Sequence, residues 1–517
     1  MMLNRRALPA CAALLLLVNH RMDAQSWMRR YDAFQQEETQ FGWSVEHDGD
    51  SGYVVFCFTT YQDSVLYGPV VGAAHLNGDG LVSAEHVSWV TGKYCYPGWS
   101  NTSDRTMDGG FVVGGSSDEG GDTIRVCVYR FAAGGQPAGI HELNLPGVAW
   151  IGRQAKQTLD GGFLICGETS ATGTLDAFLV KTDSLFQVQW VQTYGSPNRR
   201  DLALAVALAP NGGYYLGGKK EITFNNFDQW VLRLDENGNQ IWQATYGVAG
   251  NNDVPNAHLE ALADGNCVFA SAWNLTGNGE HTLCLVKIDT AGGVLWSHTY
   301  GGWCGGCSLF AVKEITPGGD LISCGQAWSI ADDGEQGVLL RTTAQGDSVW
   351  QRNFFYADSL MSDGQGTLRD VLPTTDGGFI AVGMVYSSAS GNNPPGYGQD
   401  LWVVKVDSMG CLEPGCHLIT GLTSQVTNLR GALRVWPNPV QAQGQGQVQV
   451  AWDLPEAVTG SAQLTLVSAA GQVMGSWPVA LAEQGHTLDL GGTAAGLYHV
   501  HLVVEGRWVS GAKVVVE

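Results

Sequence analysis

The chain has 517 residues, of which only 15% are charged, and it carries 70 glycines and a formal net charge of −22. A charge of this sign and size argues against binding to nucleic acid or to anionic membrane surfaces, because both would be repelled. Apolar residues do not recur at helical spacing over long stretches, so the sequence favours short strands joined by glycine-rich turns.

Residues 1–24 have the pattern of a secretory signal peptide. Arg5 and Arg6 form a basic start, and the apolar run 7–18 is too short to span a bilayer. We expect cleavage after Ala24. No later segment is long and apolar enough to be transmembrane, so the sequence predicts an exported protein without a transmembrane segment.

A repeated unit occupies most of residues 25–416, and its clearest copy runs from 157 to 195. That copy reads QTLDGGFLICGE, then DAFLVKTD, then WVQTYG. Aspartate and glycine tolerate the positive φ that tight hairpin turns need, so each DGG-like turn separates two short strands. Together with the strand ahead of that turn, the unit supplies four antiparallel strands in about 50 residues, which is typical of a β-propeller blade.

Seven copies of this unit follow one another at spacings of 51 to 58 residues. The aligned turn positions are Gly52, Gly110, Gly162, Gly213, Asn266, Asp320 and Gly378. The last copy lacks its W…TYG strand, while Trp27 and Tyr31 near the other end of the chain have the same spacing. The sequence therefore predicts an all-β fold with a seven-bladed β-propeller over residues 25–416, closed by the N-terminal strand, which leaves no unpaired sheet edge.

A polar linker, residues 417–432, leads into a second region, residues 433–517, whose strands break the repeat period. The main alternating segments there are 448–454, 462–477, 486–490 and 496–517. This pattern predicts a small Ig-like β-sandwich of about seven strands.

The last 85 residues resemble the type A C-terminal sorting domain of the type IX, or Por, secretion system of Bacteroidetes. The resemblance is carried by Pro437, Asn438, Pro439, the turn 469–472, Gly496, Leu497, Tyr498, Lys513 and 514–516. It implies Sec export, passage across the outer membrane through the type IX secretion machinery, and removal of this domain with release or surface anchoring. The upstream repeats are similar to propeller repeats common in the same bacteria, a resemblance that implies no defined ligand.

Three residues of the sorting motif have backbone properties that suggest a structural role. Pro437 and Pro439 fix φ and remove two backbone donors, so we expect them to set the entry into the first strand of the second region. We expect Gly496 to permit a tight turn into a late strand.

Two cysteine pairs are candidate disulfides, since export makes disulfides chemically accessible. Cys411 and Cys416 would fix the chain where the propeller ends. Cys304 and Cys307 are expected in a loop between blades, as a local staple or as two free thiols. This loop lacks the helix N-terminus that a thioredoxin-type motif needs.

Motifs for catalysis or metal binding are missing from the sequence. It contains no zinc-type H-E-x-x-H, no G-x-S-x-G nucleophile elbow and no phosphate-binding loop. Residues 235–239 and 77–80 resemble fragments of calcium loops, but they lack the terminal glutamate, and a hairpin turn explains them better. We therefore predict no cofactor and no metal, and we name no catalytic residue.

Loop lengths distinguish the two faces of the predicted ring. The turns on one face are uniformly short, whereas the connections on the other vary in length, and variable loops on a rigid scaffold often carry binding sites. The variable connections are 219–227, 247–255, 273–280, 328–336, 356–366 and 386–399. They carry the candidate ligand-face residues Phe224, Phe227, Trp273, Trp328 and Tyr397. The alternative is that these are solvated loops under weak constraint.

Two functions remain open. One is a non-catalytic binding or scaffold protein, secreted or at the cell surface, with an extracellular glycan or protein as its ligand. The other is an exported glycan-acting hydrolase or lyase that uses the variable-loop face. Carboxylates about 5–10 Å apart in a central pocket would favour the enzyme, whereas aromatic and polar residues without such a pair would favour binding.

Overall fold

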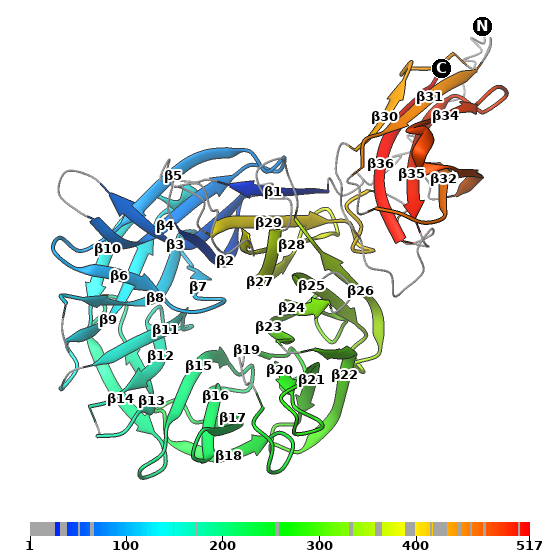
Figure 1. The fold of residues 1–517 in the computed structure, drawn as a ribbon. Coiled ribbons are helices and arrows are strands. Elements are labelled where there is room, and N and C mark those ends of the chain that lie inside the picture. Colours follow the sequence, from blue (N-terminus) through cyan, green and yellow to red (C-terminus); the bar gives the residue numbers. More distant parts are fainter. Residues whose placement is uncertain are drawn as a thin grey trace, which may run out of the picture.

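The computed structural model describes most of the chain (Figure 1). The described residues are 26–31, 39–49, 52–62, 67–120, 123–147, 149–171, 173–253, 258–304, 306–329, 334–356, 364–387, 399–413, 416, 432–441, 446–454, 458–468, 472–504 and 507–517. Strands dominate these residues, and two short 3-10 helices lie between them, Ala133–Gly135 and Leu481–Glu483. No helix within them is long and apolar enough to cross a membrane. The expected leader and nearly all of the expected linker lie outside the described residues.

Seven antiparallel sheets form a ring in the described part of residues 27–406 (Figure 1). The first strands of neighbouring sheets contact one another around the axis, and the later strands lie progressively further out. Radially arranged four-stranded sheets of this kind make a β-propeller, so the all-β prediction and the propeller architecture are confirmed.

The strands of the seven sheets follow the chain. The first three sheets contain β2 (Gln40–Asp48), β3 (Gly52–Gln62), β4 (Tyr67–Leu76) and β5 (Val82–Ser88); β6 (Tyr94–Pro97), β7 (Ser103–Arg105), β8 (Phe111–Asp118), β9 (Ile124–Phe131) and β10 (Pro137–Glu142); and β11 (Trp150–Gln157), β12 (Phe163–Thr169), β13 (Asp176–Thr182) and β14 (Val188–Tyr194). The next three contain β15 (Asp201–Leu208), β16 (Tyr214–Thr223), β17 (Asn226–Leu234) and β18 (Gln240–Tyr246); β19 (His258–Ala261), β20 (Cys267–Trp273), β21 (His281–Ile288) and β22 (Val294–Cys304); and β23 (Ser308–Glu314), β24 (Leu321–Ser329), β25 (Gly334–Thr342) and β26 (Ser348–Phe354). The last contains β27 (Gly364–Pro373), β28 (Phe379–Ser387), β29 (Asp400–Val406) and β1 (Trp27–Tyr31).

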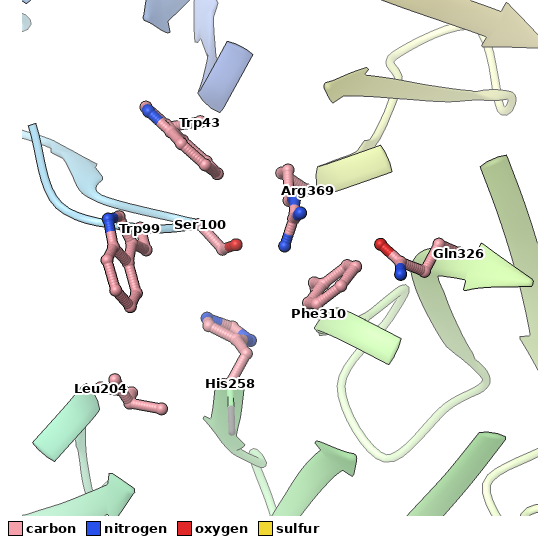
Figure 2. Close-up of a pocket in the computed structure, with 8 residues that line it drawn as sticks. All are labelled: Trp43, Trp99, Ser100, Leu204, His258, Phe310, Gln326 and Arg369. Carbon is pink, nitrogen blue, oxygen red and sulfur yellow. The ribbon is translucent and has the colours of Figure 1, made fainter. Parts of the chain in front are cut away.

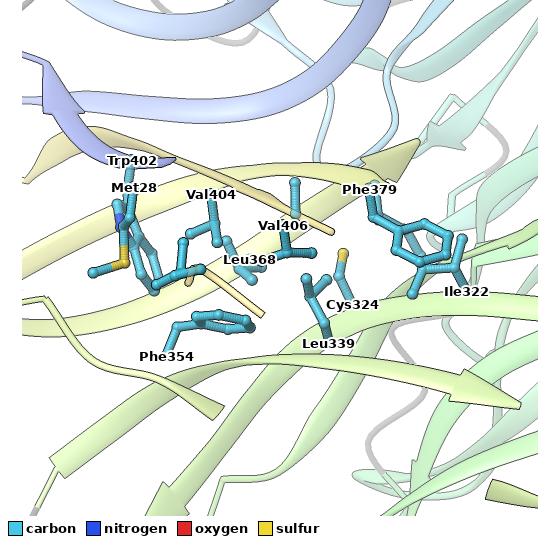
Figure 3. Close-up of a cluster of buried hydrophobic side chains, with 14 of the residues drawn as sticks. Met28, Ile322, Cys324, Leu339, Phe354, Leu368, Phe379, Trp402, Val404 and Val406 are labelled. Atoms are coloured by element: carbon cyan, nitrogen blue, oxygen red, sulfur yellow. The ribbon is translucent and has the colours of Figure 1, made fainter. Parts of the chain in front are cut away.

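The N-terminal strand β1 closes the ring, as the sequence predicted. It pairs antiparallel with β29, in a register that places Trp27 opposite Lys405 and Tyr31 opposite Leu401. Met28 enters the apolar core between the sixth and seventh sheets, where Figure 3 shows it next to Trp402 and above Phe354. The first and last parts of the propeller thus share one sheet and one core.

The repeated W-x-x-x-Y motif holds neighbouring sheets together. The Tyr194 hydroxyl of β14 donates a hydrogen bond of 2.7 Å to the Gly238 carbonyl, in the turn between the outer strands of the next sheet. The equivalent tyrosine-to-carbonyl bonds join Tyr31 to Gly80, Tyr246 to Gly292 and Tyr300 to Gly346, at 2.7 to 2.8 Å. Each motif therefore stabilises an interface with the following sheet as well as its own strand.

The aspartate of the DGG-like turn pairs with the basic residue of the repeat. In the third sheet, Asp160 accepts hydrogen bonds from the Gly162 amide at 3.0 Å and the Thr158 hydroxyl at 2.5 Å. Its carboxylate also lies 2.9 Å from Lys181 Nζ. The same pairing joins Asp108 to Arg130, Asp264 to Lys287, Asp320 to Arg341 and Asp376 to Lys405. Turn and strand are thus linked within each of these sheets.

The second region contains two sheets that share one apolar core. One sheet consists of β30 (Leu433–Trp436), β31 (Gln447–Trp452) and β34 (Gly485–Asp489). The other consists of β33 (Val473–Val479), β32 (Ala462–Ser468), β35 (Gly496–Val504) and β36 (Arg507–Val516). Val448, Trp452 and Leu488 from the first sheet pack with Leu464 and Val500 from the second, so the region is a two-layer sandwich.

The structure brings the two ends of the proposed sorting motif together. Asn438 donates a hydrogen bond of 2.7 Å to the Lys513 carbonyl and accepts one of 2.9 Å from the Val515 amide. Tyr498 is buried in β35, and its hydroxyl donates to the Ala494 carbonyl at 2.8 Å.

Two expectations about this motif are wrong. Pro437 and Pro439 follow β30 and end it, because β30 forms one strand earlier than expected, and both proline peptide bonds are cis. Gly496 begins β35 without a positive φ, and the left-handed glycine before that strand is Gly492, at φ 81°.

A disulfide joins Cys411 to Cys416 directly after the ring, with an S–S distance of 2.01 Å. The two cysteines pack in one buried cluster with Trp508 of β36, and the Glu413 carboxylate lies 3.7 Å from His499 of β35. The bridged segment therefore contacts both the propeller and the sandwich.

The other cysteine pair is described only in part. Cys307 is disulfide-bonded, while the side chain of Cys304 lies outside the described residues. The expectation of a loop for this pair needs correction, because β22 continues through the backbone of Cys304 and pairs there with His281.

Candidate functional site

Five of the innermost strands contain one extra residue at the same level. The ladder to the neighbouring strand skips these residues, which are Trp43, Arg153, Leu204, Phe310 and Arg369. A β-bulge bends the strand and re-aims the side chain of the extra residue. The bulges thus place five different side chains, one from each of five sheets, at the same level of the axial channel.

In the second sheet, a loop that interrupts the inner strand takes the place of the bulge. Its inner strand is divided into β6 and β7, and residues 98–102 form a short loop between them. The Asn101 amide donates to the Trp43 carbonyl at 2.7 Å, and Gln154 Nε2 donates to the Asn101 carbonyl at 2.6 Å. The interruption was not predicted, and it places Trp99, whose side chain is 55% exposed, beside the axis.

The backbone of this loop is held in an unusual conformation. Ser100 and Asn101 have φ values of 58° and 45°, in the left-handed region that residues with a side chain seldom adopt. A Cβ added at Gly98 would lie 1.7 Å from the Arg153 carbonyl oxygen, so only glycine fits there. Strain of this kind persists where the surrounding structure enforces it, and it is concentrated at functional sites.

These elements enclose a pocket of about 390 Å³ at the axis, which we call the axial pocket (Figure 2). The residues that line it are Trp43, Trp99, Ser100, Leu204, His258, Phe310, Gln326 and Arg369. The volume lies at the lower end of the usual range for small-molecule sites. None of these lining residues is acidic.

The guanidinium of Arg369 lies between two aromatic rings and points into the pocket (Figure 2). Its central carbon is 3.9 Å from the ring centroid of Phe310 and 5.4 Å from that of Trp43. It makes no hydrogen bond or ion pair with any described residue, and its Nε is buried without a partner. Burial lowers the pKa of Arg369 to about 10, while Glu335 acts in the opposite direction, so the group stays charged at neutral pH.

Arg153, the other arginine at a bulge, has an acidic partner. Its guanidinium donates two hydrogen bonds to the buried Glu168, the bond from Nε measuring 2.9 Å. The same guanidinium stacks on Trp99 at 3.7 Å from the ring centroid. Arg153 thus supports one face of the Trp99 ring.

His258 is a structural link between sheets. The Val312 amide of the sixth sheet donates to its Nδ1 at 3.3 Å, and its Nε2 contacts the carboxamide of Asn101. Burial, with Lys313 and Lys156 adding to it, holds the pKa of His258 well below its usual range. A neutral imidazole with both nitrogens occupied is poorly placed to act as a general base.

Charged residues lie further along the inner strands, toward the DGG-like turns. Lys156 Nζ is 3.3 Å from Asp104, and Lys313 Nζ is 3.7 Å from Glu260. Two further acids lie there: Glu46 accepts a hydrogen bond of 2.8 Å from the Ser103 hydroxyl, and Asp370 accepts one of 3.0 Å from the Ser44 hydroxyl. The carboxylates of this charged belt are therefore each engaged by another side chain.

Burial raises the pKa of Glu46 to about 7. Asp104 and Asp370 act in the same direction, whereas Lys156 and Lys313 oppose them. Glu46 therefore changes its charge near neutral pH.

The predicted ligand-face residues lie apart from the axial pocket. Phe224 is 82% exposed at the β16–β17 hairpin, Trp273 ends β20, and Trp328 lies in β24 and is 40% exposed. Phe227 lies within β17 beneath Arg200 at 5.0 Å. None of these four lines the axial pocket, and Tyr397 lies outside the described residues.

Two of the predicted variable loops are wrong. In the connection 328–336, the described residues belong to β24 and β25 and pair with one another there. Residues 219–227 are mainly strand, because β16 continues to Thr223 and β17 begins at Asn226, which leaves a tight hairpin. Asn225 supplies the positive φ of that turn, at 57°.

Sequence reasoning missed the axial residues Trp43, Trp99 and Arg369. Two signals were present: Trp43 and Trp99 fall outside the W-x-x-x-Y positions, and the unit that contains 98–102 is one of the two longest.

Metal binding gains no support from the side chains. Among the described residues, no group of three or more His, Cys, Asp or Glu side chains is placed to hold a metal ion.

No family model and no curated protein matches the chain. Among solved structures, the β-propeller domain of the Trilobed protease from Pyrococcus furiosus is 8% identical, with a TM-score of 0.39 over 71% of this chain and 95% of that one. An endo-arabinase from Bacteroides thetaiotaomicron is 10% identical, with a TM-score of 0.29 over 49% and 92%. A lignostilbene dioxygenase from Pseudomonas brassicacearum is 8% identical, with a TM-score of 0.34 over 62% and 89%. Likenesses of this size say nothing about ligand or activity, so the function has to be argued from the site.

Proposed function

We propose that the protein is a non-catalytic binding protein, secreted or held at the cell surface, that takes a small ligand in the axial pocket. In this proposal the ring is a seven-bladed β-propeller, and the C-terminal sandwich is an Ig-like type IX sorting domain. The observation that carries the binding role is the lining of the axial pocket: three aromatic rings, an unpaired guanidinium and polar groups, without an acidic residue.

The alternative is a hydrolase or lyase that acts on glycans. Glycoside hydrolysis most often uses two carboxylates that flank the scissile bond, one of them as a general acid. Of the axial carboxylates, Asp104 and Glu260 pair with Lys156 and Lys313, and Glu46 accepts a hydrogen bond from Ser103. None of the three lines the axial pocket. This arrangement favours binding over hydrolysis.

Export is proposed from the second region. Its motif residues Asn438, Lys513 and Tyr498 belong to one compact sandwich, which forms separately from the closed ring. A closed propeller needs no further sheet for its own stability, which supports a separate role for the sandwich. Export by the type IX machinery is the role that the sequence resemblance implies.

The binding proposal is tested with the full-length mature protein against an array of extracellular glycans, glycan fragments and small organic acids. Any ligand found is then titrated against Trp99→Ala, and Phe224→Ala serves as the matched aromatic control outside the pocket. Loss of binding in Trp99→Ala alone supports the axial pocket. Loss in Phe224→Ala alone, or turnover of a glycan by the wild-type protein, would overturn the proposal.

A further inference from the structure

We propose that the ligand of the axial pocket is a ring that carries a carboxylate, with Arg369 binding the carboxylate and Trp99 stacking on the ring. This inference rests on the proposed binding function and specifies its ligand. Two observations carry it: the unsatisfied guanidinium and the half-covered indole, both of which face the same 390 Å³ space (Figure 2).

Arg369 is available to an anion in a way that the other bulge arginine is not. Arg153 donates both arms of its fork to Glu168. The acid that acts on Arg369 is Glu335 of the neighbouring sheet, but that carboxylate accepts a hydrogen bond from the Tyr386 hydroxyl and forms no ion pair with Arg369. A buried charge without a partner is costly in a folded protein. An incoming carboxylate would remove that cost and accept two parallel hydrogen bonds.

The surroundings of Arg369 fix the direction of its donors. Phe310 at 3.9 Å and Trp43 at 5.4 Å hold the planar group by cation–π contacts. Aromatic faces attract the charge without accepting conventional hydrogen bonds, so the N–H groups remain free for a ligand. A planar fork held in this way matches the geometry of a carboxylate, which a lysine would not reproduce.

Trp99 supplies a flat surface across the pocket. Arg153 covers one face of its ring at 3.7 Å, while Trp99 is 55% exposed and lines the axial pocket. The strained backbone at Ser100 and Asn101 positions the ring, and Gln154 and Trp43 hold that backbone by hydrogen bonds. A rigid aromatic platform of this kind favours a flat or ring-shaped ligand over a flexible chain.

The net charge of the whole chain is opposite in sign to the charge of Arg369. With a net charge of −22, the general field of the protein repels anions. Selectivity for an anion therefore has to come from the pocket itself. Two ligand sources share the required chemistry, an acidic sugar and an aromatic acid.

The experiment measures the affinity of each acid and of its neutral analogue by isothermal titration calorimetry of the full-length mature protein. The probes are glucuronate against glucose, and benzoate against benzamide. We expect one acid of the two pairs to bind at least about tenfold more tightly than its neutral analogue, which is the usual gain from a hydrogen bond to a charged group. Whichever pair shows the difference identifies the source of the ligand.

Arg369→Met is the decisive variant, because methionine fills an aromatic slot without charge. We expect it to melt no lower than wild type and to bind the acid and its neutral analogue equally. Arg369→Lys should recover part of the preference, and Arg341→Gln, at an ion pair outside the pocket, should leave it unchanged. Trp99→Ala should weaken both members of the pair by a similar factor.

The outcomes separate this inference from the proposed function. If neutral rings bind through Trp99 and the carboxylate adds nothing, the inference fails while the binding function stands. If Arg369→Met retains the preference for the acid, the inference also fails. If no probe binds and Trp99→Ala changes the binding of no ligand from the wider array, both fail.

Discussion

At the scale of single residues, the glycines of the outer turns explain why the repeat tolerates so little change. Gly346 has a φ of 84° and accepts the hydrogen bond from Tyr300. A Cβ added there would lie 2.6 Å from the ring of His298 and 2.9 Å from the ring of Trp296, both in the preceding sheet. The W-x-x-x-Y motif thus requires a glycine about 50 residues later, and the sequence repeats both.

Gly346→Ala is expected to destabilise the propeller by about 2 kcal/mol or more, since it combines left-handed backbone strain of about 1–2 kcal/mol with a steric clash. The matched control is Gly377→Ala, which has the same φ of 84° but open space where the Cβ would stand. Denaturant unfolding of both variants isolates the contribution of the contacts with the Trp296 and His298 rings. Equal losses in the two variants would show that these contacts contribute nothing.

Glu46 predicts a pH dependence of stability. Because its folded pKa of about 7 is higher than its ordinary value of 4.5, the folded state binds its proton more tightly than the unfolded chain does. The contribution of Glu46 to stability is therefore largest at or below about pH 4.5 and falls as the pH rises toward 7.

Glu46→Gln should remove this dependence, so the stability of the variant relative to wild type should rise between pH 5 and pH 7.5. The change is on the order of 1.4 kcal/mol per unit of pKa shift. Glu483→Gln, at an exposed residue of the sandwich, is the control. A relative stability of Glu46→Gln that stays constant across this range would show that the carboxyl titrates normally.

At the scale of elements, the sequence predicted what the repeats encode directly. The DGG-like turns, the strand pattern and the pairing of β1 with β29 follow from local turn chemistry and from the missing copy of one strand. The bulges at Trp43 and Arg369 could not be read in this way. One extra residue in an inner strand is hidden by repeat lengths that already vary between 51 and 58.

The axial pocket was also beyond the reach of local patterns. Its residues come from different sheets, and neighbours across the pocket are separated by 50 or more residues in the chain. Trp99 and Arg369 line the same pocket only because the ring closes, and no spacing rule within one repeat connects them. Variation in loop length drew attention to the outer loops, whereas the bulges act at the axis.

Deleting residues 27–31 should lower the melting temperature by at least several degrees. The deletion exposes the edge of β29 and removes Trp27, Met28 and Tyr31 from two apolar clusters. A chain that begins at residue 26 serves as the control and should melt like the mature protein. Unchanged melting after the deletion would contradict closure by β1.

At the scale of the whole molecule, two units with separate cores meet at the disulfide-bridged segment that ends the ring. Cys411, Cys416 and Trp508 pack together, and Glu413 approaches His499. The two cores share no residue, so each unit is expected to fold without the other.

Removing residues 433–517 should leave a folded propeller that stays in the periplasm, because the proposed sorting signal is lost with the sandwich. Cell fractionation of a type IX-competent host measures the location, and thermal melting of the purified product checks the fold. Met474→Gln, on an exposed strand of the sandwich, is the control and should be exported normally. Normal amounts of the truncated chain outside the cell would contradict the sorting assignment.

The central claim is that the axial pocket is the binding site, and a crystal structure of the full-length mature protein with its best carboxylate ligand tests it most directly. We expect ligand density between Arg369 and Trp99, with two carboxylate oxygens at hydrogen-bond distance from the guanidinium. Density at the outer hairpin near Phe224, or on the face of the DGG-like turns, with an empty axial pocket, would contradict it.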